Sequence, residues 1–377
     1  MPKSAKRKNN KIYIIAACAA AAVALLSAVC IIGYSMFGKD DAKPVANAVT
    51  TAAATSAATS AKSTTAVQTT NSEKTTAAKT TSAAKTAAAK TDGGNTGNTS
   101  KSGYADALNN YLSQFSSVPQ SGTVNKTAEA MTIGYQILVN NKYAFNVEQE
   151  QDLMMMTDLK NRAFTVAYTD LDADRFTLQQ FNSMNRTYYN KYGEKLNVCS
   201  GFRSYQSQKR LFDNSVAKNG EEETLKWYTR PGHSEHHTGF AIDYNTNSFG
   251  SSAFTGTGDE AWVKKNCEDY GFILRYTADK KPITGVAAEA WHFRQVGIPH
   301  AKYIMNNDLC LEEYIDKIKG YSYDKPLSVK TANGEYTFYV WYVPLGDKDN
   351  TDISLSGYSK YTVSGNNVDG FIVTALK

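Results

Sequence analysis

The sequence is poor in cysteine and proline, with only 5 and 8 of these residues among 377. Two of the cysteines, Cys18 and Cys30, lie in an apolar run near the N-terminus, which leaves Cys199, Cys267 and Cys310 in the rest of the chain. Three cysteines permit at most one disulfide, and none of the three stands at metal-binding spacing from another. The pattern argues against cysteine ligation of a metal.

The chain also lacks a strong excess of either charge, since 41 Lys and Arg residues stand against 36 Asp and Glu residues. Five of the basic residues precede the first apolar run, and from Gly103 onward 28 basic residues stand against 32 acidic ones. A near-neutral to acidic folded part has no basic surface that could follow a phosphate backbone. This balance excludes nucleic-acid binding.

No charged residue occurs between Lys11 and Lys39, and the run from Tyr13 to Gly33 is apolar except for Ser27. About 20 apolar residues suffice for a helix that spans a bilayer. We expect a signal anchor over residues 13–37, with the basic residues 1–12 on the cytoplasmic side. The chain would then be a single-pass protein of the cell membrane whose folded part lies outside the cytoplasm, in the cell-wall zone. The alternative is a cleaved signal peptide, although its apolar core usually has only about 7–15 residues.

No aromatic residue occurs between Phe37 and Tyr104, where the sequence consists mainly of Ala, Thr, Ser, Lys and Asn. Such a segment cannot bury enough apolar surface to offset the entropy lost on ordering. We therefore interpret residues 38–102 as a disordered stalk.

The folded part shows helix and strand patterns without regular alternation, which favours an α+β fold. We divide it into an N-terminal helical extension (103–136), a main domain (137–320) and a β-rich C-terminal appendage (321–377). Helices are expected at residues 104–115, 178–191, 204–219, 259–270 and 299–319, and strands at 196–200, 240–244, 272–276 and 290–294. In the appendage, the stretch NNVDG predicts a hairpin turn.

All five histidines fall between residues 233 and 300, and His236 and His292 have acidic neighbours at Asp243 and Glu289. A catalytic zinc has three protein ligands drawn from His and carboxylates, and a nearby carboxylate can act as general base. His236, Asp243 and His292 could be the ligands, with Glu289 as the base. Because residues three apart point to opposite faces of a regular strand, Glu289 and His292 can converge only at a turn or bulge. Ordinary packing of a histidine beside Trp291 is the alternative.

A second informative stretch is SGFRSYQSQKR, in which Arg203 follows an expected strand and a glycine. A cation at such a turn can project into a cleft and stabilise the oxyanion of a tetrahedral intermediate. A surface salt bridge is the alternative interpretation of the same arginine.

Three stretches in this order, SGFRSY, SEHHTGFAID and EAWHFR, resemble the VanY-type zinc D-alanyl-D-alanine carboxypeptidases. This family belongs to the LAS-type peptidoglycan peptidases. The resemblance covers residues 137–318 and includes the family signature S-x-H-x-x-G-x-A-x-D without a gap. It implies a small antiparallel sheet flanked by helices, of the LAS-type or hedgehog-like kind, that holds one Zn²⁺.

The resemblance also implies roles for individual residues. The implied metal ligands are His236, Asp243 and His292, and the implied catalytic residues are Glu289 and Arg203. The implied substrate-binding residues are Arg203, Gln208, Ser234 and Trp291. The chain departs from the family pattern at Phe202, Ala290 and Gln295, which leaves the ligands intact but can alter the substrate cleft.

The implied activity is hydrolysis of the C-terminal D-Ala from the D-Ala-D-Ala stems of peptidoglycan or its precursors, by a monomer whose partner is the stem peptide. Two alternatives stay open at this point. An L,D-carboxypeptidase or a stem-peptide endopeptidase could use the same fold, and a zinc-stabilised wall-binding module would need no catalysis. The presence of Glu289 argues against the last, because a structural metal site needs no proton shuttle.

Overall fold

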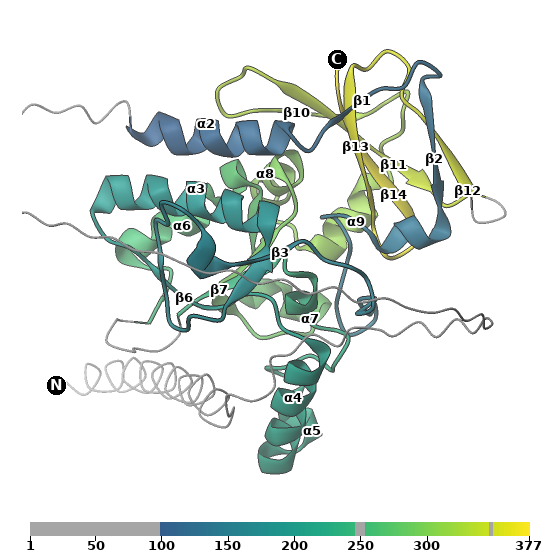
Figure 1. The fold of residues 1–377 in the computed structure, drawn as a ribbon. Helices are drawn as coiled ribbons and strands as arrows, with labels where there is room; N and C mark the ends of the chain where they lie inside the picture. The colour runs from purple at the N-terminus through teal and green to yellow at the C-terminus, as the bar shows by residue number, and fades with distance from the viewer. Residues whose placement is uncertain (1–98, 246–252, 347–349) are drawn as a thin grey trace, which may run out of the picture. The chain divides into compact units, whose positions relative to one another are not determined.

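The computed structural model describes residues 99–245, 253–346 and 350–377 (Figure 1). The expected membrane anchor, and almost all of the expected stalk, lie outside these residues. Within the described ranges, no helix combines the length and the apolar character that a membrane span requires.

A five-stranded sheet forms the centre of the main part of the chain, as the α+β prediction required. Its strand order is β4-β6-β7-β9-β8, and every neighbouring pair is antiparallel except β4 and β6, which are parallel. The strands are β4 (Thr165–Val166), β6 (Asn197–Ser200), β7 (Ala241–Tyr244), β8 (Phe272–Tyr276) and β9 (Glu289–Gln295). The prediction of an antiparallel sheet is thus confirmed for all but one edge strand.

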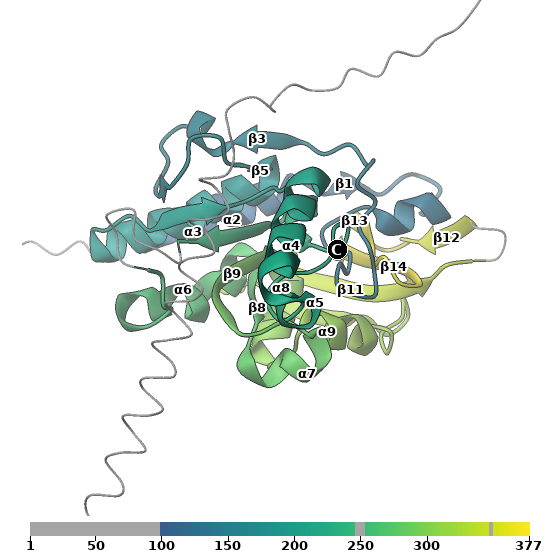
Figure 2. The same ribbon diagram turned by 90° about the horizontal axis from the view of Figure 1, so that it is seen from below.

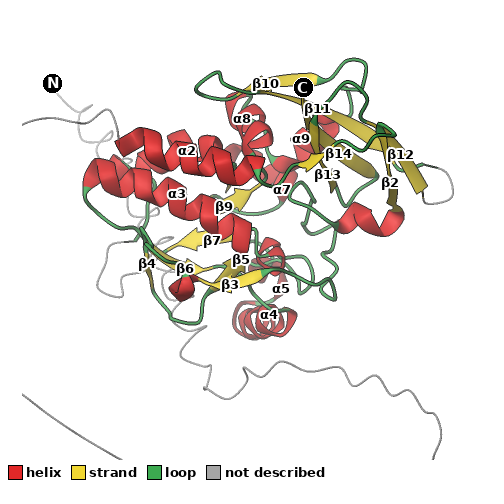
Figure 3. Cartoon of the chain, turned by 45° about the horizontal axis from the view of Figure 1, so that its top comes forward, coloured by secondary structure: helices red, strands yellow, loops and turns green. Residues whose placement is uncertain are grey.

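Two helices that lie side by side, α2 (Thr99–Leu112) and α3 (Arg175–Tyr192), cover one face of this sheet (Figure 3). Helix α3 begins where the Asp174 side chain accepts a hydrogen bond from the Thr177 N–H, and it ends at Gly193 in the left-handed conformation. Phe181 and Met184 of α3 pack with Ile242 and Phe293 of the sheet in one apolar cluster. The short ribbon of β3 (Leu153–Met155) and β5 (Asp172–Asp174) precedes α3.

Two long helices of the sequence analysis are interrupted in the structure. The expected helix 259–270 consists of α6 (Ala261–Asn266) between two 3₁₀ turns. The expected helix 299–319 is divided into α8 (Ile298–Asn306) and α9 (Leu311–Ile318). Asp308 between them has a φ of 51°, which ends α8, and Cys310 with Glu313 forms a capping box that starts α9.

The C-terminal segment forms a second antiparallel sheet in the order β1-β13-β14-β11-β10. Its strands are β1 (Ser116–Ser117), β10 (Leu327–Lys330), β11 (Thr337–Pro344), β13 (Lys360–Gly365) and β14 (Gly370–Leu376), and beside it β2 (Thr123–Thr127) pairs with β12 (Asn350–Ser354). The predicted hairpin turn is confirmed, because Asn366 Oδ1 accepts hydrogen bonds from the N–H groups of Val368, Asp369 and Gly370. The segment 103–136, interpreted as helical, is α-helical only to Leu112 and then supplies β1, β2 and a 3₁₀ turn at Ala128–Thr132.

This second sheet shares an apolar core with the first. Ile273 of β8, Ile315 of α9, and Val340 and Ile372 of the second sheet belong to one buried cluster. His300 of α8 lies 2.6 Å from the Tyr314 hydroxyl through Nδ1 and 2.9 Å from Thr374 Oγ1 through Nε2. Helices α8 and α9, beside the C-terminal strands in Figure 1, thus join the two sheets.

We predict that Ile372→Ala lowers the free energy of unfolding by about 2–5 kcal/mol, because it opens a cavity in this shared core. The exposed Ile283, with 48% of its surface accessible, is the matched control, and Ile283→Ala should change stability by less than about 0.5 kcal/mol. Urea unfolding of the full chain measures both values. Equal effects of the two substitutions would contradict the shared core.

Candidate metal centre

The three expected metal ligands come together in the structure. Asp243 and His292 are paired residues of the antiparallel strands β7 and β9, so their side chains leave the same face of the sheet. His236 belongs to the 3₁₀ turn Glu235–Thr238 that leads into β7. One ligand atom from each residue lies within 4.8 Å of the other two. Among the residues that the structure describes, no other group of His, Cys, Asp and Glu side chains meets this criterion.

Gly239 allows the chain to turn from His236 into β7. Its φ is 73°, and a Cβ at this position would come within 2.9 Å of the Asp174 backbone nitrogen. A residue with a side chain would therefore be strained in conformation and would also collide with the start of α3. The glycine of the sequence signature is explained by this close approach.

Hydrogen bonds on the far side of each imidazole orient the two rings. His236 Nδ1 lies 2.7 Å from the Gly201 carbonyl oxygen, which can only accept, so Nδ1 donates and Nε2 is left facing Asp243 Oδ2 at 3.1 Å. His292 Nε2 lies 3.2 Å from Glu235 Oε2, and its Nδ1 faces Asp243 Oδ1 at 2.9 Å. One nitrogen of each ring is therefore directed at the same carboxylate.

The arrangement fits a divalent metal ion. Asp243 Oδ1 is buried without a well-directed hydrogen bond, although His292 Nδ1 is close to it. Burial disfavours the charged form of Asp243, but His236 and His292 outweigh this effect and hold its pKa below the ordinary value. Two imidazole nitrogens and one carboxylate oxygen are a typical donor set of a catalytic zinc site.

Glu289 reaches the same place through a bulge. Leu274 pairs with Phe293 but Tyr276 pairs with Glu289, so β9 contains extra residues between these two pairs. The irregularity brings Glu289 Oε2 to 3.6 Å from His292 Nδ1. The bulge that the two side chains need in order to face the same site is therefore present. Burial raises the pKa of Glu289 to about 8. The carboxyl group is thus poised to take up and release a proton near neutral pH.

Arg203 lies next to His236 because a backbone hydrogen bond connects the two residues. The Arg203 N–H donates to the His236 carbonyl oxygen at 3.0 Å, and the Arg203 carbonyl oxygen accepts from His237 Nδ1 at 2.7 Å. The guanidinium donates to Gln208 Oε1 and Ser200 Oγ, each at 3.0 Å. Both partners are uncharged. These contacts are therefore not the surface salt bridge that was the alternative interpretation of Arg203.

The remaining expected site residues have clear packing environments. Gln208, in helix α4 (Tyr205–Asn219), is buried and also donates to the Thr229 carbonyl oxygen at 2.7 Å, so its amide holds Arg203 in place. Ser234 Oγ accepts from the His236 N–H at 3.3 Å and caps the 3₁₀ turn. Trp291 is half-buried and packs against the apolar cluster under the sheet. Figure 2 shows α4 and the short α5 (Glu221–Thr224) near one end of this sheet.

Glu235 is a buried charged group beside the centre that could not be recognised from the sequence motifs. Glu235 Oε1 lies 2.7 Å from Arg275 Nε and 2.9 Å from Arg294 Nη1, and all three side chains are essentially inaccessible to solvent. Glu235 occupies a variable position of the signature, so the motif did not mark it. The signal that could have found it is the presence of two arginines within apolar strand sequences, because fully buried arginines require partners.

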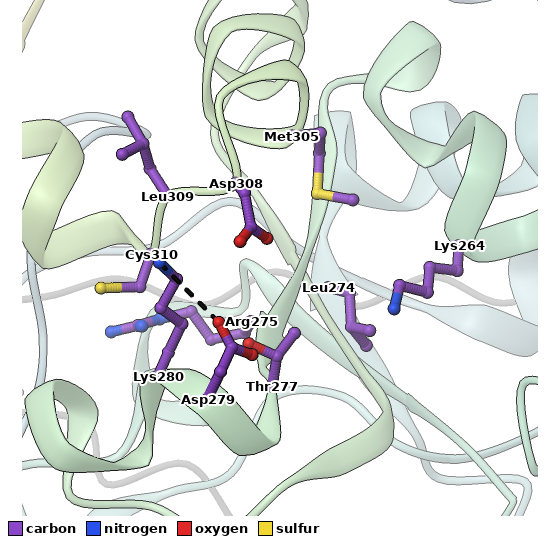
Figure 4. Close-up of a pocket in the computed structure, with 10 residues that line it drawn as sticks. All are labelled: Lys264, Leu274, Arg275, Thr277, Asp279, Lys280, Met305, Asp308, Leu309 and Cys310. Atoms are coloured by element: carbon purple, nitrogen blue, oxygen red, sulfur yellow. Dashed lines mark ion pairs between the residues drawn. The ribbon is translucent and has the colours of Figure 1, made fainter.

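A small pocket between β8 and the region of α8 and α9 is separate from the centre (Figure 4). Its charged lining includes Lys264, Lys280, Asp279 and Asp308, and none of the expected metal ligands takes part. Cys310 also lines it, and this thiol is buried, as are those of Cys199 and Cys267. The three described cysteines form no disulfide.

We predict that Gly239→Ala displaces His236 and lowers the free energy of unfolding by more than the matched control Gly193→Ala. Gly193 has a similar φ of 76°, but no heavy atom lies within 4 Å of the point that a Cβ would occupy there. The control therefore reports the conformational strain alone, about 1–2 kcal/mol. Thermal unfolding of both variants gives the comparison. Equal losses would show that the contact with Asp174 does not constrain the turn.

The chain is similar to known proteins of one family. Residues 173–298 match the family described as VanY: D-alanyl-D-alanine carboxypeptidase. A D-alanyl-D-alanine carboxypeptidase of Enterococcus faecium is 30% identical over 263 residues, which cover 66% of this chain and 78% of the relative. YodJ of Bacillus subtilis, a candidate carboxypeptidase by its name, is 37% identical over 188 residues, which cover 48% of this chain and 67% of YodJ.

A solved structure extends the likeness to the fold. The vancomycin-resistance D,D-dipeptidase VanXYg, solved in complex with a D-Ala-D-Ala phosphinate analogue, is 32% identical with a TM-score of 0.60. The match covers 68% of this chain and 98% of that structure. The chain belongs to the VanY family of D-alanyl-D-alanine carboxypeptidases.

Proposed function

We propose that the protein is a zinc-dependent carboxypeptidase that removes the C-terminal D-Ala from D-Ala-D-Ala stems of peptidoglycan or its precursors. The observation that carries the proposal is the convergence of His236, Asp243 and His292 beside Glu289. The relatives named for this activity, and the D-Ala-D-Ala analogue bound to VanXYg, support the same substrate class.

His236 Nε2, His292 Nδ1 and a carboxylate oxygen of Asp243 would hold the ion. When bound, zinc polarises the scissile carbonyl and lowers the pKa of a water molecule. Glu289 takes a proton from the attacking water and hands it to the leaving amine of D-Ala. Its burial favours this exchange, because the pKa of an exposed glutamate would be too low to return the proton near neutral pH.

Arg203 supplies the positive charge of the substrate site. Held by Gln208 and Ser200, its guanidinium is fixed before substrate arrives and need not reorganise as negative charge develops. We assign it the contact with the oxyanion or with the terminal carboxylate of the peptide. Gln208 would act mainly by holding Arg203, with Ser234 and Trp291 as further substrate-binding residues.

The location of this chemistry is part of the proposal. The uncharged run after Lys11 supports a membrane anchor with the N-terminus inside, followed by a stalk that carries the catalytic part into the cell-wall zone. There the enzyme would act as a monomer on the stem peptide.

We expect the zinc-loaded full chain to release free D-Ala from a pentapeptide that ends in D-Ala-D-Ala. Glu289→Gln should lower kcat by about 10²- to 10⁴-fold and leave zinc bound, because it removes the proton shuttle and no ligand. Chromatography of the products and metal analysis of both proteins provide the measurements.

Product identity separates the alternatives. Release of the D-Ala that remains on a tetrapeptide stem would indicate L,D-carboxypeptidase activity, and internal cleavage would indicate an endopeptidase. Absence of any product with zinc bound would contradict the enzymatic proposal and favour a wall-binding module.

We predict that zinc affinity rises with pH, about tenfold per pH unit while one proton is displaced. Burial disfavours a second proton on His292, but Asp243 and Glu235 outweigh it and raise the pKa of His292 to about 10 in the metal-free protein. Below this pKa a proton occupies Nδ1 and competes with the ion. Chelator competition between pH 6 and 9 checks the slope, and a pH-independent affinity would contradict it.

A further inference from the structure

We infer that Glu235 is a positioning residue that fixes the ring of His292, so that Nδ1 and not Nε2 faces the metal centre. The inference rests on the proposed function in so far as the centre must bind a metal ion. It assigns a role to a residue outside the three ligands, the base and the substrate contacts.

The first step is the contact between the two side chains. Glu235 Oε2 lies 3.2 Å from His292 Nε2, and the Glu235 side chain has only 1% of its surface accessible. The guanidinium groups of Arg275 and Arg294 both contact this carboxylate, and contacts with two cations favour its ionised form. An ionised carboxylate only accepts hydrogen bonds, so the proton of this contact belongs to Nε2. Nδ1 is then the nitrogen left for the centre.

The second step is the fixation of Glu235 itself. Its Oε1 accepts from Arg275 Nε at 2.7 Å and from Arg294 Nη1 at 2.9 Å, which leaves Oε2 for His292. Both guanidinium groups have no accessible side-chain surface. The carboxylate is held from one side by two cations and presents its other oxygen to the imidazole.

The third step is the fixation of the two arginines. Arg275 donates through Nη1 and Nη2 to the two carboxylate oxygens of Glu312 in α9, each at 2.8 Å. Arg294 Nη2 donates to the carbonyl oxygens of Ile137 at 2.9 Å and of Tyr135 at 3.1 Å. The orientation of His292 is thereby tied to β8, β9, α9 and the segment from Tyr135 to Ile137.

Stability alone is a weak reason for such a cluster, because buried ion pairs are often replaceable by apolar residues without loss. A hydrogen-bonded carboxylate behind a metal-binding histidine has a definite use, since it sets the tautomer and the ring orientation. Glu235 and Glu312 form a matched pair for a test. Glu235 contacts His292 directly, whereas Glu312 contacts Arg275.

The test compares Glu235→Gln with Glu312→Gln in the full chain. Both substitutions remove one negative charge from the same cluster and should lower the unfolding temperature. We expect Glu235→Gln also to weaken zinc binding by about 10- to 100-fold in chelator competition. Glu312→Gln should weaken zinc binding far less than Glu235→Gln, because it acts on Arg275 and leaves both Arg294 and His292 in contact with Glu235.

Equal zinc affinities of the two variants would overturn the inference and reduce Glu235 to a structural role. A measurement on the unsubstituted protein keeps the inference testable if a variant does not fold. In its zinc-loaded form, imidazole ¹⁵N chemical shifts should place the proton of His292 on Nε2, and a proton on Nδ1 would overturn the inference. Failure of the unsubstituted protein to bind zinc would instead contradict the proposed function.

Discussion

The register between β7 and β9 is the constraint on which the site depends. Asp243 lies directly opposite His292, and both side chains therefore leave the same face of the sheet. A slip of one residue would turn one of them to the opposite face, where Phe293 and Ile242 pack against α3. Burial of Ile242 and Phe293 against α3 therefore also fixes Asp243 and His292, because it places both of them together on the opposite face of the sheet.

The centre combines this register with a second layer of fixed groups. Gly201 orients His236 through its carbonyl oxygen, and Glu235 orients His292 through its carboxylate. Arg203 is held by hydrogen bonds to two neutral partners, Gln208 and Ser200. These groups are positioned before any ligand arrives, which is the arrangement that electrostatic catalysis requires.

Much of the site could be predicted because its residues stand in short motifs. His236 and Asp243 lie close in the sequence, connected by a short turn that ends at Gly239. The need for a bulge between Glu289 and His292 follows from strand periodicity alone. The helix ends at Gly193 and Gly271 could also be predicted, because glycine adopts the left-handed conformation without strain. The turn at Asn366 could be predicted because an asparagine side chain can accept hydrogen bonds from the N–H groups that follow it.

The rest depends on contacts between distant segments, which local patterns do not encode. The division between α8 and α9 depends on a left-handed Asp308, a conformation that aspartate adopts only in some contexts. The pairing of Ser116 with Tyr361 and the burial of Glu235 between Arg275 and Arg294 join residues far apart in the sequence. Such partners become visible only in the folded chain.

X-ray absorption at the zinc edge of the metal-loaded full chain tests the central claim most directly. The account predicts a first shell of nitrogen and oxygen atoms alone at about 2.0–2.2 Å, with the signature of two imidazoles. Their number should fall to one in His236→Ala. Sulfur at about 2.3 Å, or a shell unchanged by that substitution, would contradict it.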